Sequence, residues 1–266
     1  MSYIKLAAHR GVAGANIPCN SLQAFTVALR QGADIVELDV ENSADGVLFI
    51  QHPGMEPVHL RMQDSIRSYP SDMVERFKLS NCDLLPTDQS IVRLEDALKL
   101  LKGKCIVNID KFWRNPGPIT EMVRALGMEN EVIIKCSLRE DRLAEVEKYA
   151  PDLPFMSVAS EVDKTEEMIR GKKINWIGTE VLFGTEDAPV AGAAYIKKMK
   201  AGGRLVWVNA LVYNYKTVLA AGHNDDISMV EDEQKGWGWL ARRGFDIIQT
   251  DFLLPCKQFL EKEGFR

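Results

Sequence analysis

Short apolar segments alternate with longer amphipathic segments along the whole chain, and this alternation constrains the fold more than any other feature. Near-continuous apolar strands separated by helices are typical of a parallel sheet that is covered on its faces. The expected strands are Lys5–His9, Ile35–Val40, Val47–Gln51, Cys105–Asp110, Val132–Cys136, Phe155–Ala159, Trp176–Val181, Leu205–Leu211 and Ile247–Asp251. The expected helices include Ser21–Gln31, Leu94–Leu101, Ile119–Ala125, Arg139–Tyr149, Lys164–Arg170, Ala191–Met199 and Asp232–Arg242.

The number of strands favours a closed barrel. If Val47–Gln51 is set aside, eight strands remain in a chain of 266 residues, and a (β/α)₈ barrel needs roughly 250. A doubly wound open sheet is the alternative, but no Gly-rich phosphate loop of the GxGxxG type follows the first strand. The sequence has no internal repeat or Ser/Gly linker. We therefore expect residues 1–266 to form one domain with the α/β fold of a (β/α)₈ TIM barrel.

Two long segments do not fit a minimal barrel. Pro53–Ile91 follows the second barrel strand, contains several Pro, Asp and Asn residues, and is expected to form loops with a short helix. Val212–Glu231 follows the seventh barrel strand and is rich in Asn, Asp, Gly and His. Long loops in compact domains tend to be functional. In this fold the loops that follow strands form the face that carries the chemistry.

Charge and cysteine content restrict the partners and the compartment. The net charge is −5 and the pI is about 5.5, whereas a nucleic-acid-binding domain usually carries a basic face. No segment reaches the roughly 20 continuous apolar residues of a membrane-spanning helix, and no secretory signal is visible. The five cysteines are widely spaced without a CxxC pair, which favours reduced thiols. We expect a cytoplasmic protein without a nucleic-acid partner or stable membrane association; the sequence does not determine its oligomeric state.

The residues that suggest chemistry are concentrated before residue 55. His9-Arg10-Gly11 ends the first strand, Glu37 and Asp39 end the second, and His52 follows an Asp-Gly turn. Alternate residues of a strand project from one face, so Glu37 and Asp39 lie side by side. Two adjacent carboxylates repel unless a proton or cation separates them, and Mg²⁺ or Ca²⁺ is a natural occupant. A solvated pair of acids at a strand end is the alternative.

The order and spacing of these motifs resemble the glycerophosphodiester phosphodiesterase family, a group of phospholipase-C-like barrels. The family signature reads H-R-G, then P-E-N-T-x-x-A-F, then G-A-D-x-x-E-x-D-V, and finally D-G-x-x-V-x-x-H-D. The corresponding residues here are His9-Arg10-Gly11, Pro18-Cys19-Asn20-Ser21, Ala24-Phe25, Gly32-Ala33-Asp34, Glu37, Asp39-Val40, Asp45-Gly46 and His52. Weaker matches downstream are Val107–Lys111 and the Thr250-Asp251 pair, so the resemblance spans nearly the whole chain.

This resemblance implies a set of site residues. It implies one divalent cation, Mg²⁺ or Ca²⁺, bound by Glu37, Asp39 and Asp110, with His9 and His52 sharing the proton transfers. Arg10 is placed to bind the phosphate. Lys135 ends the fourth strand and, with Lys111, supplies positive charge; Trp207 and Asn209 share one face of the seventh strand. The expected substrate-binding residues are thus Arg10, Lys111, Lys135, Trp207 and Asn209, although Trp207 also suits an ordinary buried position.

The sequence departs from the family pattern at two acids. Cys19 stands in place of the Glu of P-E-N-T, and Pro53 follows His52 in place of an Asp. The resemblance implies metal-dependent hydrolysis of a small phosphodiester, a glycerophosphodiester or a sugar-containing analogue, to an alcohol and a phosphomonoester. Two alternatives remain open from sequence. One is a phospholipase-D-like lyase that releases a cyclic phosphate, and the other is a non-catalytic barrel that binds phosphorylated ligands.

Overall fold

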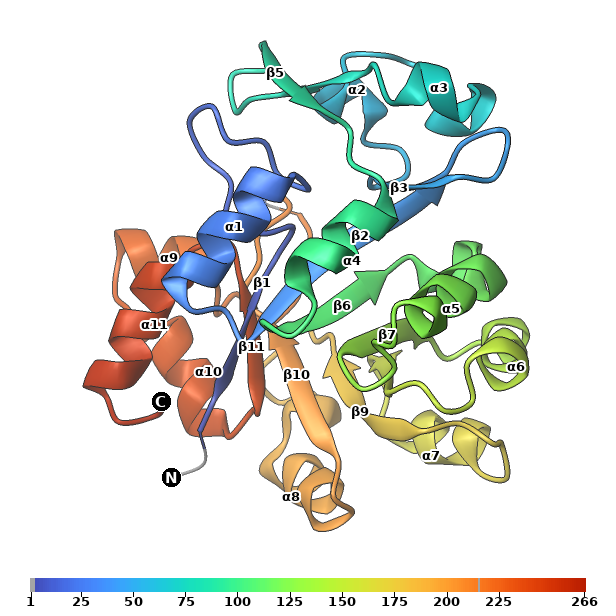
Figure 1. Cartoon of the computed structure of the whole chain (residues 1–266). Coiled ribbons are helices and arrows are strands. Elements are labelled where there is room, and N and C mark those ends of the chain that lie inside the picture. Colours follow the sequence, from blue (N-terminus) through green and yellow to red (C-terminus); the bar gives the residue numbers. More distant parts are fainter. Residues whose placement is uncertain (1–2, 215) are drawn as a thin grey trace.

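A closed barrel of parallel strands forms the body of the molecule (Figure 1). The computed structural model describes residues 3–214 and 216–266. β1 pairs in parallel with both β2 and β11, which closes the sheet. The barrel strands are β1 (Lys5–Ala8), β2 (Ile35–Asn42), β6 (Ile106–Asp110), β7 (Val132–Ser137), β8 (Phe155–Ala159), β9 (Trp176–Val181), β10 (Leu205–Asn209) and β11 (Ile247–Thr250). The predicted (β/α)₈ barrel is confirmed.

Helices surround the strands in Figure 1, and apolar residues of helices and strands share one core cluster. In α4 the buried residues are Leu94, Ala97, Leu98 and Leu101, the i, i+3, i+4, i+7 pattern of a helix with one buried face. The longer helices are α1 (Leu22–Gln31), α4 (Leu94–Leu101), α5 (Pro116–Ala125), α6 (Glu140–Tyr149), α7 (Asp163–Ile169), α8 (Ala193–Ala201), α10 (Trp237–Arg243) and α11 (Leu253–Lys262). Short 3-10 turns precede α5 (Phe112–Arg114) and α8 (Pro189–Ala191). No helix in the described ranges is long and apolar enough to cross a membrane.

The turn between α1 and β2 fixes the position of the two acids of β2. Ser21 caps the start of α1 by accepting a hydrogen bond from the Ala24 N–H. Gly32 ends α1 at φ +84°, a left-handed conformation that glycine adopts without strain. Three residues later the chain enters β2. Asp39 of β2 is then the register partner of Asp110 of β6.

Side chains inside the barrel change from apolar to polar along the strands. At the amino-terminal end, an apolar cluster of Ala7, Ile35, Ile133, Met156, Trp207 and Ile247 fills the interior. Two positions further along, on the same strand faces, five of the six residues are polar, namely His9, Glu37, Lys135, Asn209 and Gln249, and the sixth is Val158. The interior is therefore solid at one end and polar at the carboxyl ends of the strands, where this fold carries its active sites.

The segment after β2 has more structure than the loops and single short helix expected from the sequence. β3 (Leu48–Ile50) pairs antiparallel with β2. It is followed by α2 (Glu56–His59), a 3-10 turn (Ile66–Ser68), α3 (Ser71–Val74) and the hairpin of β4 (Lys78–Ser80) and β5 (Pro86–Ser90). These elements lie together beyond the barrel wall (Figure 1). A separate apolar cluster, too widely spaced in sequence to show periodicity, holds them: Phe49, Leu60, Ile66, Val74, Leu79 and Ile91.

The segment after β10 also contains a helix. The expected loop Val212–Glu231 includes α9 (Asp225–Val230), which is capped by Asn224 through a hydrogen bond from the Ile227 N–H. The helix expected from Asp232 begins instead at Trp237, because residues 232–236 form a turn. Both long insertions thus carry short elements to the end of the barrel where the strands terminate.

Candidate active site

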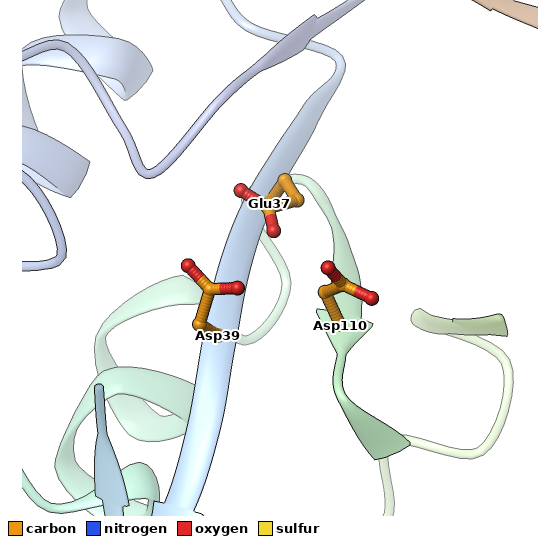
Figure 2. A group of neighbouring side chains, drawn as sticks. All are labelled: Glu37, Asp39 and Asp110. Carbon is orange, nitrogen blue, oxygen red and sulfur yellow. The ribbon is translucent and has the colours of Figure 1, made fainter. Parts of the chain in front are cut away.

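Three carboxylates from two adjacent strands meet at the carboxyl end of the barrel. Glu37 and Asp39 project from β2, and Asp110 ends β6. One oxygen from each lies within 4.8 Å of the others, and Figure 2 shows the three groups facing a common space beside β2. Glu37 is 2% exposed and Asp39 is 1% exposed. Charge on these buried groups needs compensation, because an isolated carboxylate is costly to remove from water.

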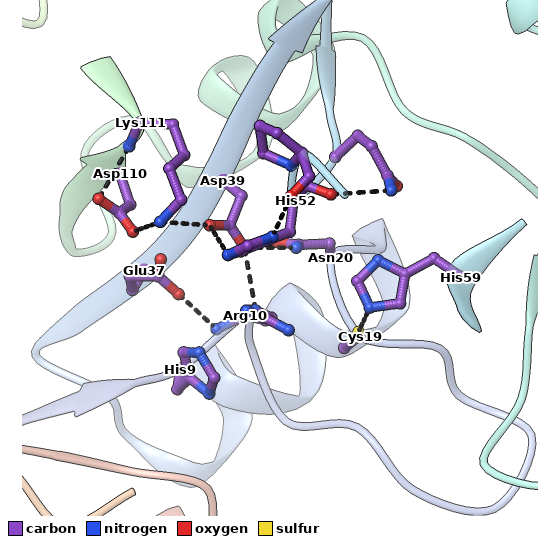
Figure 3. Close-up of polar contacts among 12 residues, drawn as sticks. His9, Arg10, Cys19, Asn20, Glu37, Asp39, His52, His59, Asp110 and Lys111 are labelled. Carbon is purple, nitrogen blue, oxygen red and sulfur yellow. Dashed lines mark hydrogen bonds and ion pairs between the residues drawn. The ribbon is translucent and has the colours of Figure 1, made fainter. Parts of the chain in front are cut away.

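Two cations of the chain supply part of that compensation. Arg10 Nε lies 2.9 Å from Asp39 Oδ2, and the Arg10 backbone N–H donates to Glu37 Oε2 at 2.8 Å. Lys111 Nζ bonds the Asp110 carboxylate and lies 3.6 Å from Asp39 Oδ1 (Figure 3). Both cations follow strand ends in the left-handed backbone region, with φ of 56° and 60°. Such non-glycine conformations are costly and concentrate at functional sites.

Burial and neighbouring charge act differently on the two acids of β2. Burial and the charge of Asp39 raise the pKa of Glu37 above its ordinary value. Burial would also raise the pKa of Asp39, but the charges of Arg10 and Lys111 outweigh it and lower this pKa. Asp39 Oδ1 is buried and has no hydrogen-bond partner among the described residues. Hard oxygen donors crowded in this way, one of them unpartnered, fit a divalent cation such as Mg²⁺ or Ca²⁺.

The two predicted histidines lie beside this cluster (Figure 3). His9 Nδ1 is 2.8 Å from Asp251 Oδ1. Burial lowers the pKa of His9, but the hydrogen bond with Asp251 and the charge of Glu37 outweigh burial, so this pKa is raised. His52 Nδ1 donates to the Pro53 carbonyl at 2.9 Å, while its Nε2 lies 3.9 Å from Asp39 Oδ1. Burial outweighs the charge of Asp39 and lowers the pKa of His52.

A cavity of about 210 Å³ opens over these groups and receives most of the residues predicted from sequence. Asp39 and Trp207 are almost fully buried; they and His52 do not line it. The predicted residues that do line it are His9, Arg10, Glu37, Asp110, Lys111, Lys135 and Asn209.

The opposite wall of the cavity is a hydrogen-bonded network that is neutral as a whole. Lys135 Nζ pairs with Glu180 Oε2 at 2.5 Å and lies 3.8 Å from the centre of the Trp207 ring. Asn209 Nδ2 donates to Glu180 Oε1 at 2.7 Å. The Trp207 indole N–H donates to Asn209 and to Gln249, at 3.1 and 3.2 Å. Lys135 is thus compensated by the protein itself, and Trp207 supports this wall from below.

Three residues of the site were missed by the sequence prediction. Glu180 is the one charged residue of β9, and such an isolated charge in a barrel strand is a signal that could have identified it. Asp251 was noted as part of a motif but not assigned to His9. Tyr213 comes from the loop after β10, and its ring meets the His9 ring edge-on at 5.9 Å. No sequence pattern around Tyr213 indicates that contact.

The position of the missing family acid is occupied by an uncharged pair. Cys19 Sγ lies 3.4 Å from His59 Nε2 (Figure 3). Burial raises the pKa of Cys19 to about 11. Burial, with a smaller contribution from Arg10, lowers the pKa of His59 to about 4. Both side chains are therefore neutral at pH 7.

His223, in the loop after β10, is held away from the candidate site. Its ring stacks on Trp239 at 3.9 Å. One ring nitrogen lies 2.5 Å from the Lys235 carbonyl, and the other lies 2.9 Å from a Glu186 carboxylate oxygen. It does not line the active-site cavity.

Sequence relatives carry the same family name that the motifs suggest. A glycerophosphodiester phosphodiesterase of Bacillus altitudinis is 28% identical over 173 residues, covering 62% of this chain and 70% of that protein. The resemblance to the glycerophosphodiester phosphodiesterase family is confirmed. A family model described as a domain of unknown function matches residues 155–260, so it covers the second half of the barrel.

Solved structures of the glycerophosphodiester phosphodiesterases share the whole fold. The protein from Parabacteroides distasonis superposes with a TM-score of 0.81 at 18% identity, over 98% of this chain and 87% of its own. A phosphodiesterase from Oleispira antarctica, solved with its product sn-glycerol-3-phosphate, gives a TM-score of 0.66 at 16% identity over 97% of both chains. At these identities the structures establish the shared barrel fold.

Proposed function

We propose that this protein is a phosphoric diester hydrolase of the glycerophosphodiester phosphodiesterase type. The observation that carries the proposal is the meeting of Glu37, Asp39 and Asp110 within 4.8 Å. His9 lines the cavity above them, and His52 Nε2 lies 3.9 Å from Asp39 Oδ1. The substrate is a small phosphodiester, a glycerophosphodiester or a sugar-containing analogue. The products are an alcohol and a phosphomonoester. The product complex of the Oleispira antarctica protein supports this substrate class.

One divalent cation, Mg²⁺ or Ca²⁺, belongs to the proposal. Glu37, Asp39 and Asp110 would hold it, and when bound it would act as a Lewis acid that offsets the negative charge of the phosphate. The buried Asp39 Oδ1, which accepts no hydrogen bond and has Lys111 Nζ only at 3.6 Å, supports this assignment. Arg10, anchored on Asp39 through Nε, directs the rest of its guanidinium to the phosphate oxygens.

The two histidines transfer the protons. The Pro53 carbonyl can only accept a hydrogen bond, so it fixes neutral His52 with its proton on Nδ1 and leaves Nε2 free to accept one. Asp251 holds His9 through Nδ1 in the same way and stabilises its imidazolium form. Each ring thus presents Nε2 to the reacting groups. One activates the nucleophile, and the other protonates the leaving oxygen.

The remaining predicted residues form the substrate-binding walls. Lys111 lies next to the carboxylate cluster, and Lys135 and Asn209 face the cavity from the opposite side. Trp207 orients Asn209 from beneath. A wall of hydrogen-bonding groups suits the hydroxyls of a glycerol or sugar. We further propose that residues 1–266 act as one barrel domain. The widely spaced cysteines, which favour reduced thiols, support a cytoplasmic location.

Phosphorus NMR of reaction mixtures tests this proposal. Glycerophosphodiesters and sugar phosphodiesters are incubated with the protein and Mg²⁺, Ca²⁺ or Mn²⁺, and parallel samples receive EDTA. We expect a phosphomonoester signal that EDTA abolishes. A cyclic phosphate as the final product would identify a lyase. Binding of the diesters without turnover under any metal would identify a non-catalytic barrel.

A further inference from the structure

Asp225, the first residue of α9, is a buried acid that the proposed mechanism does not use. Its side chain belongs to the insertion after β10, and the residue is 2% exposed. Its backbone N–H donates to the Ala210 carbonyl at 2.7 Å. The insertion therefore delivers this carboxylate to the space between the ends of β10 and β11.

The two oxygens of Asp225 have different partners. Oδ1 accepts hydrogen bonds from Trp237 Nε1 at 2.6 Å and from Thr250 Oγ1 at 2.7 Å. Oδ2 accepts one from the Asp251 backbone N–H at 2.8 Å. The carboxylate thus accepts hydrogen bonds from two consecutive residues, Thr250 and Asp251, at the end of β11. Only the Oδ2 bond reaches the residue that contacts His9.

Asp251 needs such a support. Its side chain is 45% exposed, yet its Oδ1 holds His9 Nδ1 at 2.8 Å. An exposed aspartate on a turn can adopt several rotamers, and each alternative would release the His9 ring. A fixed backbone N–H at Asp251 limits the positions that its carboxylate can take.

We propose that Asp225 is a positioning residue, which sets the Asp251 backbone through Oδ2 and thereby orients His9 for proton transfer. This inference rests on the proposed function of His9. It assigns to the insertion after β10 a role in the chemistry rather than in packing alone. The alternative is that Asp225 only anchors α9 through Oδ1.

The variant Asp225→Asn separates these two roles. The amide oxygen can keep the bonds from Trp237 and Thr250, while the amide nitrogen at the Oδ2 position meets the Asp251 N–H donor to donor. We expect kcat to fall about 10- to 100-fold, because a catalytic group displaced by about 1 Å loses rate on this scale. KM should stay within about twofold, because substrate contacts are unchanged. The ¹⁵N NMR signal of His9 Nδ1 should shift as its hydrogen bond weakens.

Trp237→Phe is the matched control. It removes one donor to Oδ1 and leaves the Asp251 contact in place. We expect it to lower thermal stability while kcat and the His9 signal stay close to those of the wild type. If Trp237→Phe lowers kcat as much as Asp225→Asn, Asp225 acts only as an anchor and the inference is overturned.

A double variant with Asp251→Asn tests the route of action. If Asp225 acts through Asp251, adding Asp225→Asn to Asp251→Asn should change kcat by less than about twofold. If the fall in kcat of the double variant equals the product of the falls in the two single variants, the inference is overturned. If the wild type itself shows no turnover, the proposed function fails. The His9 signal still decides the positioning role, since an unchanged signal in folded Asp225→Asn contradicts it without reference to activity.

Discussion

The two sides of the active-site cavity differ in how their buried charges are compensated. On the side of β1, β2 and β6, three carboxylates face Arg10 and Lys111, and Asp39 Oδ1 remains unpartnered among the described residues. On the side of β7, β9 and β10, Lys135 and Glu180 compensate each other, Asn209 donates to Glu180, and Trp207 donates in turn to Asn209. The carboxylates of the first side outnumber its two cations, whereas the acid and the cation of the second side compensate each other.

This difference separates chemistry from recognition. A cluster with excess negative charge binds a metal strongly, because the metal relieves the repulsion between carboxylates that the fold holds close together. An ion pair whose charges compensate each other attracts a charged ligand only weakly. Its contribution is to hold the side chains of the binding surface in fixed positions. Substitutions on the first side should therefore lower kcat, and substitutions on the second side should affect stability and KM rather than kcat.

Asp39→Asn should give the largest effect. It removes a metal ligand and the partner of Arg10 together. We expect turnover to fall about 10⁴-fold or more, since Lewis-acid stabilisation is worth several kcal/mol and each 1.4 kcal/mol is tenfold. Titration calorimetry should also show loss of Mg²⁺ and Ca²⁺ binding. The control is Asp152→Asn, an exposed acid paired with Arg124, which should leave both unchanged. Metal binding of wild-type strength in folded Asp39→Asn would refute the assignment.

His52→Ala should give the next largest effect. General acid–base catalysis contributes about 10²–10⁴-fold per group, so kcat on an unactivated diester should fall by that factor. A p-nitrophenyl leaving group should rescue the variant only if His52 is the acid. His223→Ala is the matched histidine control, because its ring nitrogens are bound to Glu186 and Lys235 rather than placed beside Asp39. Near-normal turnover of His52→Ala on the unactivated diester would remove His52 from the mechanism.

Lys135→Met should affect stability more than catalysis. It leaves Glu180 buried without its cation, and breaking such a pair typically costs about 3–5 kcal/mol. Urea denaturation should show this loss. The double variant Lys135→Met/Glu180→Gln should recover most of it, because the Gln oxygen can still accept from Asn209. A stable Lys135→Met protein with a greatly reduced kcat would place this lysine in the chemical step and break the contrast between the two sides.

The smallest effect expected is a pH dependence of stability from Asp225. Burial raises the pKa of Asp225 from 3.8 to about 7 in the folded protein, so the folded state retains a proton that the unfolded chain releases. The contribution of this retained proton to the free energy of unfolding is fully present below about pH 4. It is lost as pH rises toward 7, at up to about 1.4 kcal/mol per pH unit. Denaturation at several pH values should show this slope in the wild type. Asp225→Asn should lack it, and identical slopes in the two proteins would contradict the prediction.

Local patterns were sufficient to predict the barrel and the pair of acids on β2, whereas Asp110 was implied by the family resemblance. The strands were predicted nearly to the residue because each is a short apolar run bounded by turn residues, as in Phe155–Ala159. Glu37 and Asp39 share a face by the two-residue period of a strand. The β4–β5 hairpin in the insertion after β2 was not predicted. The apolar cluster of this insertion joins residues as distant in sequence as Phe49 and Ile91.

The sequence by itself determined the barrel, the pair of acids on β2 and the motifs around His9 and His52, because these depend on periodicity and on spacing along one segment. Only the tertiary structure decided which charges remain available. It paired Lys135 with Glu180, 45 residues away, and joined His9 to Asp251 across the closure of the barrel. The physical reason is that compensation of charge depends on distance in space. A linear pattern shows which residues are charged, and the fold decides which of them neutralise one another.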